Sequence, residues 1–140
     1  MQQALAVARK AFEKNEVPIG AVLQTPTEVL QYANICHSQD NPLLHAEVRV
    51  LQAACERFPR SVLQASTLFV TLEPCPMCMG AILHSHVGRL VFGSYNLKWG
   101  AAGTVIDFST LFPVDGLEVY GGILEQECAT LLASFFQERR

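Results

Sequence analysis

Apolar and polar positions follow two different periods along this chain. Spacings of three and four residues between apolar side chains predict amphipathic helices, and short apolar runs predict buried strands. The predicted helices cover residues 2–15, 45–57, 76–85 and 124–137. The predicted strands cover residues 17–24, 28–35, 66–72, 88–93 and 117–120. Helices and strands alternate over most of the sequence, which favours an α/β fold.

The order of these segments predicts how the strands pair. The break at Thr25–Pro26–Thr27 separates the first two strands and predicts an antiparallel hairpin. A helix connects strands 66–72 and 88–93, which predicts a parallel pair with a right-handed crossover. Residues 94–116 show little periodicity, and we expect a long irregular segment there. Together these segments predict one sheet with helices on both faces.

Length and composition indicate one domain over residues 1–140, since a hydrophobic fraction of 50% can fill a single core. No apolar run approaches the roughly 20 residues of a membrane span, and the first residues lack the apolar core of a signal peptide. Five cysteines, an odd number, argue against a disulfide framework. Cys55 and Cys128 lie on apolar helical faces and should be buried. We therefore expect a cytoplasmic protein without a membrane partner.

The net charge of −3 is not that of a general nucleic-acid binder. Basic residues nevertheless cluster near both ends of the chain, at Arg9, Lys10, Lys14, Arg139 and Arg140. Such clusters either bind phosphates locally or form solvated helix faces. Charge alone leaves both interpretations open.

The segment TLEPCPMCMG, residues 71–80, carries the clearest chemistry. Cys75 and Cys78 lie three residues apart at the predicted start of a helix, so both sulfurs fall on one face of its first turn. The positive end of the helix dipole favours the thiolate form that binds metals. Pro74 and Pro76 suit this position, because the first turn has backbone N–H groups without helical partners. Two thiolates leave a tetrahedral zinc site incomplete.

His45 and Glu47 begin the second predicted helix and offer the missing chemistry. Their side chains point about 200° apart on a helix, so they cannot both bind one ion. At the first turn, however, His45 can bind the metal while Glu47 lies beside its open position. Three protein ligands and a fourth position left to water are typical of catalytic zinc. Cys36 or His37 as a fourth ligand would instead make the zinc structural.

Several stretches together resemble the bacterial tRNA adenosine deaminases of the TadA type. They are VPIGAV, HAE, TLEPCPMCMGAILHSHVGRLVFG, KWGAAG and ECATLLASFFQERR. The H-x-E and P-C-x-x-C signature is shared by the wider zinc-dependent cytidine/deoxycytidylate deaminase superfamily. The sequence motifs LEPCxMCxGA, HSxxGRxVFG and GAAG, in that order, resemble those of the tRNA enzymes. The resemblance covers nearly the whole chain.

The resemblance implies a cytidine-deaminase-like three-layer α/β/α sandwich around a five-stranded mixed sheet. It implies one Zn²⁺ held by His45, Cys75 and Cys78, with Glu47 as the catalytic proton shuttle. It also implies a homodimer that converts adenosine to inosine at the wobble position of a tRNA anticodon stem-loop. Two alternatives remain open. One is a free-base or nucleotide deaminase acting on cytosine, guanine or dCMP, and the other is a zinc-stabilised binding module without turnover.

The resemblance further implies contacts with the substrate. Asn34, at the end of its predicted strand, matches the family asparagine that binds the purine nucleoside, and the backbone of Ala46 would line the pocket. Phe135 and Phe136 match positions that contact splayed nucleotides in the family. The residues alone allow other roles. An asparagine suits a turn, and adjacent phenylalanines on a helix commonly place one ring in the core and one in an interface.

The chain departs from the family pattern beside the predicted site. It reads GSYNLKWGAAG where the bacterial enzymes usually read something like GARDAKTGAAG, so Asn96 replaces an aspartate expected near the substrate backbone. Tyr95 and Trp99 are also larger than usual. Loss of a negative charge beside phosphates and sugars should favour nucleic acid in general and relax a preference for ribose. Single-stranded DNA is therefore a second predicted partner.

Structural roles are expected for four further residues of the third predicted helix and its end. His84 and His86 suit a helix end or an interface rather than metal binding. Met77 and Met79 should pack at an interface, because the resemblance implies that this helix lies at the subunit contact.

Overall fold

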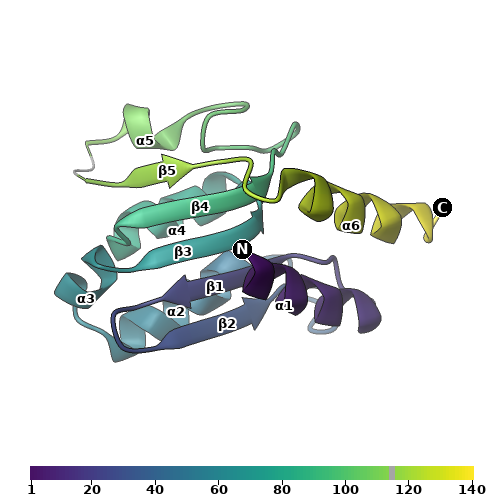
Figure 1. Cartoon of the computed structure of the whole chain (residues 1–140), viewed down its shortest axis with the longest axis horizontal. Helices are drawn as coiled ribbons and strands as arrows, with labels where there is room; N and C mark the ends of the chain where they lie inside the picture. The colour runs from purple at the N-terminus through teal and green to yellow at the C-terminus, as the bar shows by residue number, and fades with distance from the viewer. Residues whose placement is uncertain (114–115) are drawn as a thin grey trace.

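A five-stranded mixed sheet lies at the centre of the computed structural model, which describes residues 1–113 and 116–140 (Figure 1). The strands are β1 (Gly20–Gln24), β2 (Val29–Ala33), β3 (Thr67–Leu72), β4 (Arg89–Ser94) and β5 (Glu118–Tyr120). Their order across the sheet is β2-β1-β3-β4-β5. Strand β1 is antiparallel to β2 and β3, whereas β3, β4 and β5 run parallel. The predicted hairpin, parallel pair and mixed sheet are confirmed.

Helices cover both faces of this sheet (Figure 1). They are α1 (Gln2–Glu13), α2 (Ala46–Arg57), α3 (Arg60–Gln64), α4 (Pro76–Ser85), α5 (Phe108–Leu111) and α6 (Glu125–Gln137). Helices α1 and α6 lie on one face, and α2 and α4 pack side by side on the other. The arrangement is the predicted three-layer α/β/α sandwich. No helix in the described ranges is long and apolar enough to span a bilayer.

The main core lies between the sheet and helices α2 and α4. Its fully buried side chains come from the central strands and from one stripe of each helix. They include Leu68, Val70, Leu90, Val50 and Ile82. Each such side chain contributes roughly 1.5–3 kcal/mol by leaving water. This layer therefore fixes the starts of α2 and α4 against the sheet, where the predicted metal ligands lie.

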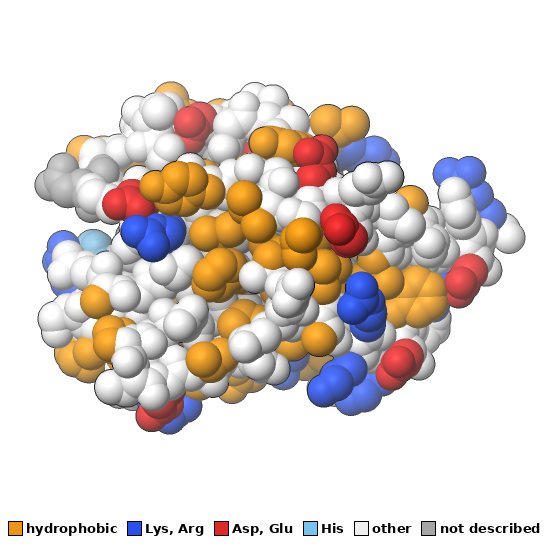
Figure 2. All heavy atoms as spheres, viewed as in Figure 1, with side chains coloured by type: hydrophobic (Ala, Val, Ile, Leu, Met, Phe, Trp, Pro, Cys, Tyr) orange, Lys and Arg blue, Asp and Glu red, His pale blue; other side chains and the backbone are white. Residues whose placement is uncertain are grey.

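The opposite face of the sheet is only partly covered by α1 and α6. Figure 2 shows hydrophobic side chains exposed over the central strands on this face. A groove of about 450 Å³ lies there, with Val22, Phe69 and Ile123 in its wall. Lys and Arg side chains gather beside it, near the end of α1.

The two short helices and one strand end differ from the sequence prediction. Helix α3 has 5 residues and α5 has 4, too few for a helical period to show. Helix α5 interrupts the predicted irregular segment 94–116, of which residues 114–115 lie outside the described residues. Asp107 sets its start by accepting hydrogen bonds from the Ser109 backbone N–H and hydroxyl. Strand β1 begins only at Gly20, because Pro18 has no N–H to give to a ladder.

Two side chains of the predicted structural set lie elsewhere than expected. Cys55 is exposed, because it lies one position after Ala54, the last residue on the buried face of α2, and so points away from that face. Met79 is fully buried in the main core rather than at a surface interface. Cys128 is buried, as predicted. His86 ends α4 in a left-handed conformation with φ of 63°, which confirms its predicted role at a helix end.

Candidate metal centre and active site

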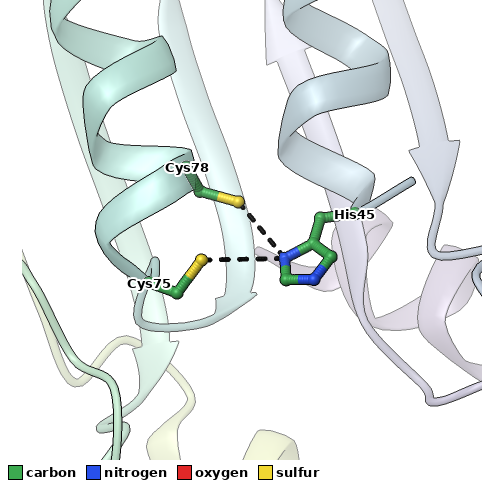
Figure 3. Close-up of side chains that lie close together, drawn as sticks. All are labelled: His45, Cys75 and Cys78. Atoms are coloured by element: carbon green, nitrogen blue, oxygen red, sulfur yellow. Dashed lines mark hydrogen bonds between the residues drawn. The ribbon is translucent and has the colours of Figure 1, made fainter. Parts of the chain in front are cut away.

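The three predicted metal ligands come together where α2 and α4 begin (Figure 3). His45 directly precedes α2, Cys75 directly precedes α4, and Cys78 lies in the first turn of α4. His45 Nδ1 is 3.7 Å from Cys75 Sγ and 3.4 Å from Cys78 Sγ. The ligand atoms of the three residues all lie within 4.8 Å of one another. This spacing suits one ion held by two sulfurs and a nitrogen.

The start of α4 is set by the residues that flank Cys75. Pro74 is fully buried and Pro76 occupies the first helical turn, where its missing N–H costs little. The Met79 N–H donates to the Cys75 carbonyl at 2.8 Å and closes that turn. The positive ends of two helices, α2 and α4, therefore meet at the sulfur pair. Both dipoles favour thiolate over thiol there.

The sulfur pair and the imidazole are electrostatically coupled. The hydrogen bond with the Cys78 thiol lowers the pKa of Cys75 to about 4, and the same contact raises the pKa of Cys78 above its usual range. The contact with Cys75 raises the pKa of His45. A divalent cation would take both sulfurs as thiolates and release the protons that they and the imidazole hold. The donor set therefore fits a soft or borderline divalent metal.

Glu47 lies beside this group without belonging to it. Its side chain projects from the first turn of α2 and is 4% exposed. Burial raises the pKa of Glu47 to about 7. Its Oε2 atom has no hydrogen-bond partner in the part of the chain that the structure describes. A buried carboxyl oxygen costs free energy until a ligand satisfies it. The site thus holds a carboxyl group that can exchange a proton near neutral pH.

Cys36 and His37 do not supply a fourth ligand. Among residues 1–113 and 116–140, only His45, Cys75 and Cys78 form a group with metal-binding distances. The Cys36 thiol instead donates to Asn34 Oδ1 at 3.2 Å. The donor set has the composition of a catalytic site rather than of a closed structural one.

A cleft of about 430 Å³ opens beside His45, and Asn34 lies in its wall. This volume falls within the roughly 300–1,000 Å³ of small-molecule sites. Asn34 directly follows β2 and is 4% exposed. Its Nδ2 donates to Glu16 Oε2 at 3.4 Å, and its Oδ1 accepts from Cys36. These two contacts fix the direction of the carboxamide at the cleft.

Two buried carboxylates, which the sequence alone did not predict, hold the loops around the site. Glu16 is 3% exposed and accepts the backbone N–H groups of His37 and Ser38 as well as Asn34 Nδ2. Glu73 is 1% exposed and accepts hydrogen bonds from the segment after β4. An acid at the end of a buried apolar strand was the available sequence signal for Glu73, because an acid there requires partners.

The other predicted substrate contacts lie outside the ligand group. Ala46 is fully buried, backbone included, at the start of α2. Asn96 Oδ1 accepts the N–H groups of Lys98 at 3.3 Å and Trp99 at 3.0 Å, and so closes a turn. Phe136 on α6 is 50% exposed.

Phe135 contradicts the expectation that both phenylalanines contact nucleotides. It is 1% exposed, and its ring packs edge-on against Phe12 of α1 with centroids 5.6 Å apart. The guanidinium of Arg139 covers its other side. Adjacent positions on a helix point about 100° apart, so one ring can lie in the core while the other faces solvent.

Comparisons with known proteins show which family the chain belongs to. The sequence pattern of the MafB19-like deaminases matches residues 1–139. The tRNA-specific adenosine deaminase of Bacillus subtilis is 42% identical over 100% of this chain and 88% of its own length. A structure from biochemical and structural studies of A-to-I editing by tRNA:A34 deaminases has a TM-score of 0.83 and 37% identity, covering 94% of this chain and 97% of that one. A guanine deaminase from Nitrosomonas europaea, with a TM-score of 0.79 and 19% identity over 96% of this chain and 81% of its own, shares the fold alone.

The chain is therefore a deaminase and belongs to the MafB19-like deaminase family. The identity along its whole length confirms the predicted resemblance and the enzyme class. Within that class, the chain belongs to the family of tRNA-specific adenosine deaminases. The roles of individual site residues stay predictions.

Proposed function

We propose that the chain is a zinc-dependent enzyme that hydrolytically deaminates adenosine to inosine at the wobble position of a tRNA anticodon loop. The observation that carries the proposal is the group of His45, Cys75 and Cys78 with the buried carboxyl of Glu47 beside it, whose Oε2 atom has no hydrogen-bond partner among the described residues. The relatives named for adenosine deamination in tRNA support the substrate. A cytoplasmic location suits that substrate and five cysteines that form no disulfide.

The proposed metal ligands are His45, Cys75 and Cys78, because two sulfurs and a nitrogen prefer Zn²⁺ to Mg²⁺ or Ca²⁺. When bound, zinc lowers the pKa of water and so supplies the nucleophile for carbon six of adenine. Glu47 takes the proton from the attacking water and passes it to the adenine ring nitrogen. Glu47 then carries a second proton, taken from the hydroxyl now on carbon six, to the exocyclic amine. The bond between carbon six and that nitrogen breaks, so that the products are inosine and ammonia.

We propose that Asn34 binds the purine nucleoside in the cleft beside His45. The contact with Glu16 occupies one of the two Nδ2 protons, so the second proton and the free lone pair of Oδ1 remain for a ligand. The backbone of Ala46 lines the same pocket in this proposal. Both residues hold the base, and neither takes part in proton transfer.

We propose that Phe136 stacks on an unpaired nucleotide, a contact worth ~1–3 kcal/mol. The ends of α1 and α6 meet where Arg139 Nε donates to Asn15 Oδ1 at 3.0 Å. The basic residues near the two ends of the chain therefore lie on two neighbouring helices or just beyond their ends, and Lys and Arg side chains gather near the end of α1 (Figure 2). This local charge offsets the net charge of −3 for a phosphate backbone.

Asn96 is proposed to widen the substrate range from RNA to single-stranded DNA. Changing Asn96→Asp should lower the ratio of DNA to RNA deamination by roughly fivefold, because a carboxylate accepts a hydrogen bond from the ribose 2′-OH ~1 kcal/mol more strongly than an amide does, and DNA lacks that hydroxyl. An aspartate can accept the same N–H groups of Lys98 and Trp99, so the turn is kept. Matched RNA and DNA hairpins measured side by side give the ratio.

Gln64→Glu is the control for that comparison, because it adds the same charge far from Asn96. Gln64 ends α3, which leads into the start of β3, whereas Asn96 follows the end of the parallel strand β4. It should leave the DNA-to-RNA ratio unchanged. An equal ratio for the parent chain and Asn96→Asp would remove Asn96 from the account of substrate range.

We propose that the chain forms a homodimer through α4 and α5. A hollow of about 320 Å³ between these helices is lined by Leu83, His84, Phe108 and Phe112, among others. Apolar residues on both sides of α5 remain exposed, with Phe112 at 51% and Ile106 at 40%. Exposed apolar clusters of this kind are typical of interaction surfaces.

Changing Phe112→Asp should raise the dimer dissociation constant at least about thirtyfold, since losing an aromatic anchor costs ~2 kcal/mol or more. Light scattering after size-exclusion chromatography, over a range of concentrations, measures the shift. Val29→Asp is the matched control, because Val29 is 46% exposed on the edge strand β2. A parent chain that stays monomeric at high concentration would exclude the dimer.

One substrate panel separates the proposed function from its alternatives. The purified chain is incubated with an anticodon stem-loop, which is then sequenced for adenosine read as guanosine. Ammonia release is measured in parallel from cytosine, guanine and dCMP. The proposal expects inosine in the hairpin and no release from the free bases or the nucleotide. Release without inosine would support a free-base or nucleotide deaminase.

A further inference from the structure

The buried carboxylate of Glu73 holds a segment that is distant in sequence. Its Oε1 accepts the backbone N–H groups of Ala102 and Thr104, each at 3.1 Å. Its Oε2 accepts the Asn96 N–H at 3.1 Å and the Thr104 hydroxyl. Each oxygen thus accepts two hydrogen bonds, and all of them come from residues 96–104. The proposed mechanism leaves Glu73 without a role.

The position of Glu73 links that segment to the metal centre. Glu73 and Pro74 directly precede Cys75, and the Pro74 carbonyl accepts the Ala101 N–H at 2.9 Å. The segment therefore touches both residues that lead into the first sulfur ligand. It leaves the carboxyl end of β4, beside the end of β3 (Figure 1). Ligands of open α/β sheets bind at such carboxyl ends.

Close packing leaves the segment little freedom to move. Gly100 lies so near the carboxylate that an added Cβ would be 2.6 Å from Glu73 Oε2 and 2.5 Å from the Asn96 carbonyl. Side chains of the same segment nevertheless project into solvent, with Leu97 at 81% and Trp99 at 65% exposed. A rigid loop that presents large apolar side chains suits contact with a ligand.

We propose that Glu73 is a positioning residue that holds residues 96–104 as one wall of the substrate site. Hydrogen bonds to a charged acceptor are stronger than neutral ones, and a carboxylate in a dry interior requires all of its partners. The segment is already ordered before the nucleic acid binds, so binding costs less conformational entropy and the affinity for the nucleic acid is higher. The inference rests on the proposed function, since residues 96–104 would contact the nucleotides that flank the reacting adenosine.

Glu73→Gln tests the inference with little change in volume. A glutamine has only one accepting oxygen, so its NH₂ group must replace one of the two carboxylate oxygens. In the place of Oε2, the NH₂ group would face the Asn96 N–H and the Thr104 hydroxyl. The Thr104 hydroxyl can turn and accept from it, but the Asn96 N–H cannot. Residues 96–104 should loosen, whereas the thiols and His45 make no hydrogen bond to Glu73 in the described structure and should keep the metal.

Hydrogen exchange, fluorescence and kinetics give three independent measurements. In Glu73→Gln, exchange of the amides of residues 96–104 should rise at least tenfold, as expected for lost charge-assisted bonds. Trp99 is the one tryptophan in the sequence, so a lower fluorescence anisotropy reports the same loosening. KM for the hairpin should rise about tenfold with kcat within about twofold, because binding is lost and chemistry is kept. Zinc content should not change.

Two further variants keep the comparison specific. Glu16→Gln alters a different buried carboxylate, which holds residues 34–38, and should leave exchange at 96–104 and Trp99 anisotropy unchanged. Thr104→Val removes only the hydroxyl contact and should raise KM by about threefold. Thr104→Val serves as the test if Glu73→Gln does not fold.

Four results would overturn the inference. Three are unchanged exchange at residues 96–104, exchange raised equally throughout the chain, and local loosening without a change in KM. The fourth is loss of zinc in Glu73→Gln. Failure of the proposed function would give a different result, because the parent chain itself would then form no inosine. The exchange comparison between the parent chain and Glu73→Gln would still show whether Glu73 holds residues 96–104.

Discussion

Replacing Glu47 with glutamine should lower deamination of the anticodon hairpin by about 10²–10⁴-fold, the usual contribution of a general acid–base group. Glutamine has nearly the same shape and cannot take a proton from water. The metal should stay bound, because Glu47 lies beside the ligand group and is no member of it. The assay pairs inosine formation with metal content measured on the same sample.

Loss of both zinc and turnover in Glu47→Gln would contradict the proton-shuttle role, because it would make Glu47 part of the metal site. Glu118→Gln is the control. Glu118 forms an exposed ion pair with Arg89, with an N–O distance of 2.8 Å, on strands β5 and β4. Removing that carboxylate should leave activity and metal content unchanged, since exposed pairs contribute little to stability.

Replacing Cys78 with serine should remove both the bound metal and the activity. Serine keeps the size of the side chain but does not supply a thiolate, so one of three ligands is lost. The loss of activity should be larger than the roughly 10–100-fold loss seen when a residue that only hydrogen-bonds to a metal ligand is removed. Metal analysis after dialysis and the hairpin assay measure the two effects.

Cys55→Ser is the matched control for that experiment, because Cys55 is an exposed thiol on α2. It should keep full metal content and full activity. A Cys78→Ser enzyme that retained its activity without metal would contradict the assignment of the site, whatever the fold.

The sequence predicts the elements that carry their own local signals. Helix α4 begins at Pro76 and ends at Ser85, as its prolines and apolar spacing indicate. Strand β1 is shorter than its apolar run, because the run continues through Pro18, which a ladder does not tolerate. Helix α5 is missed, since four residues contain a single turn and its start depends on one capping contact from Asp107.

The group of His45, Cys75 and Cys78 was predictable because the two cysteines share one helical turn and His45 begins another apolar helix. The geometry that unites them needs the packing of α2 against α4, which spacing alone does not give. Glu16 and Glu73 show the limit more clearly. Each acts through contacts with residues far along the chain, so their roles emerge only from the folded structure.

Zinc titration into metal-free protein, with inosine in the anticodon hairpin as the readout, tests the central claim most directly. The account predicts that inosine formation rises in proportion to added zinc and stops rising at one ion per chain. It also predicts that Glu47→Gln binds the same amount of zinc and forms almost no inosine. Full activity of the metal-free protein, or an unchanged hairpin at full zinc occupancy, would contradict the account.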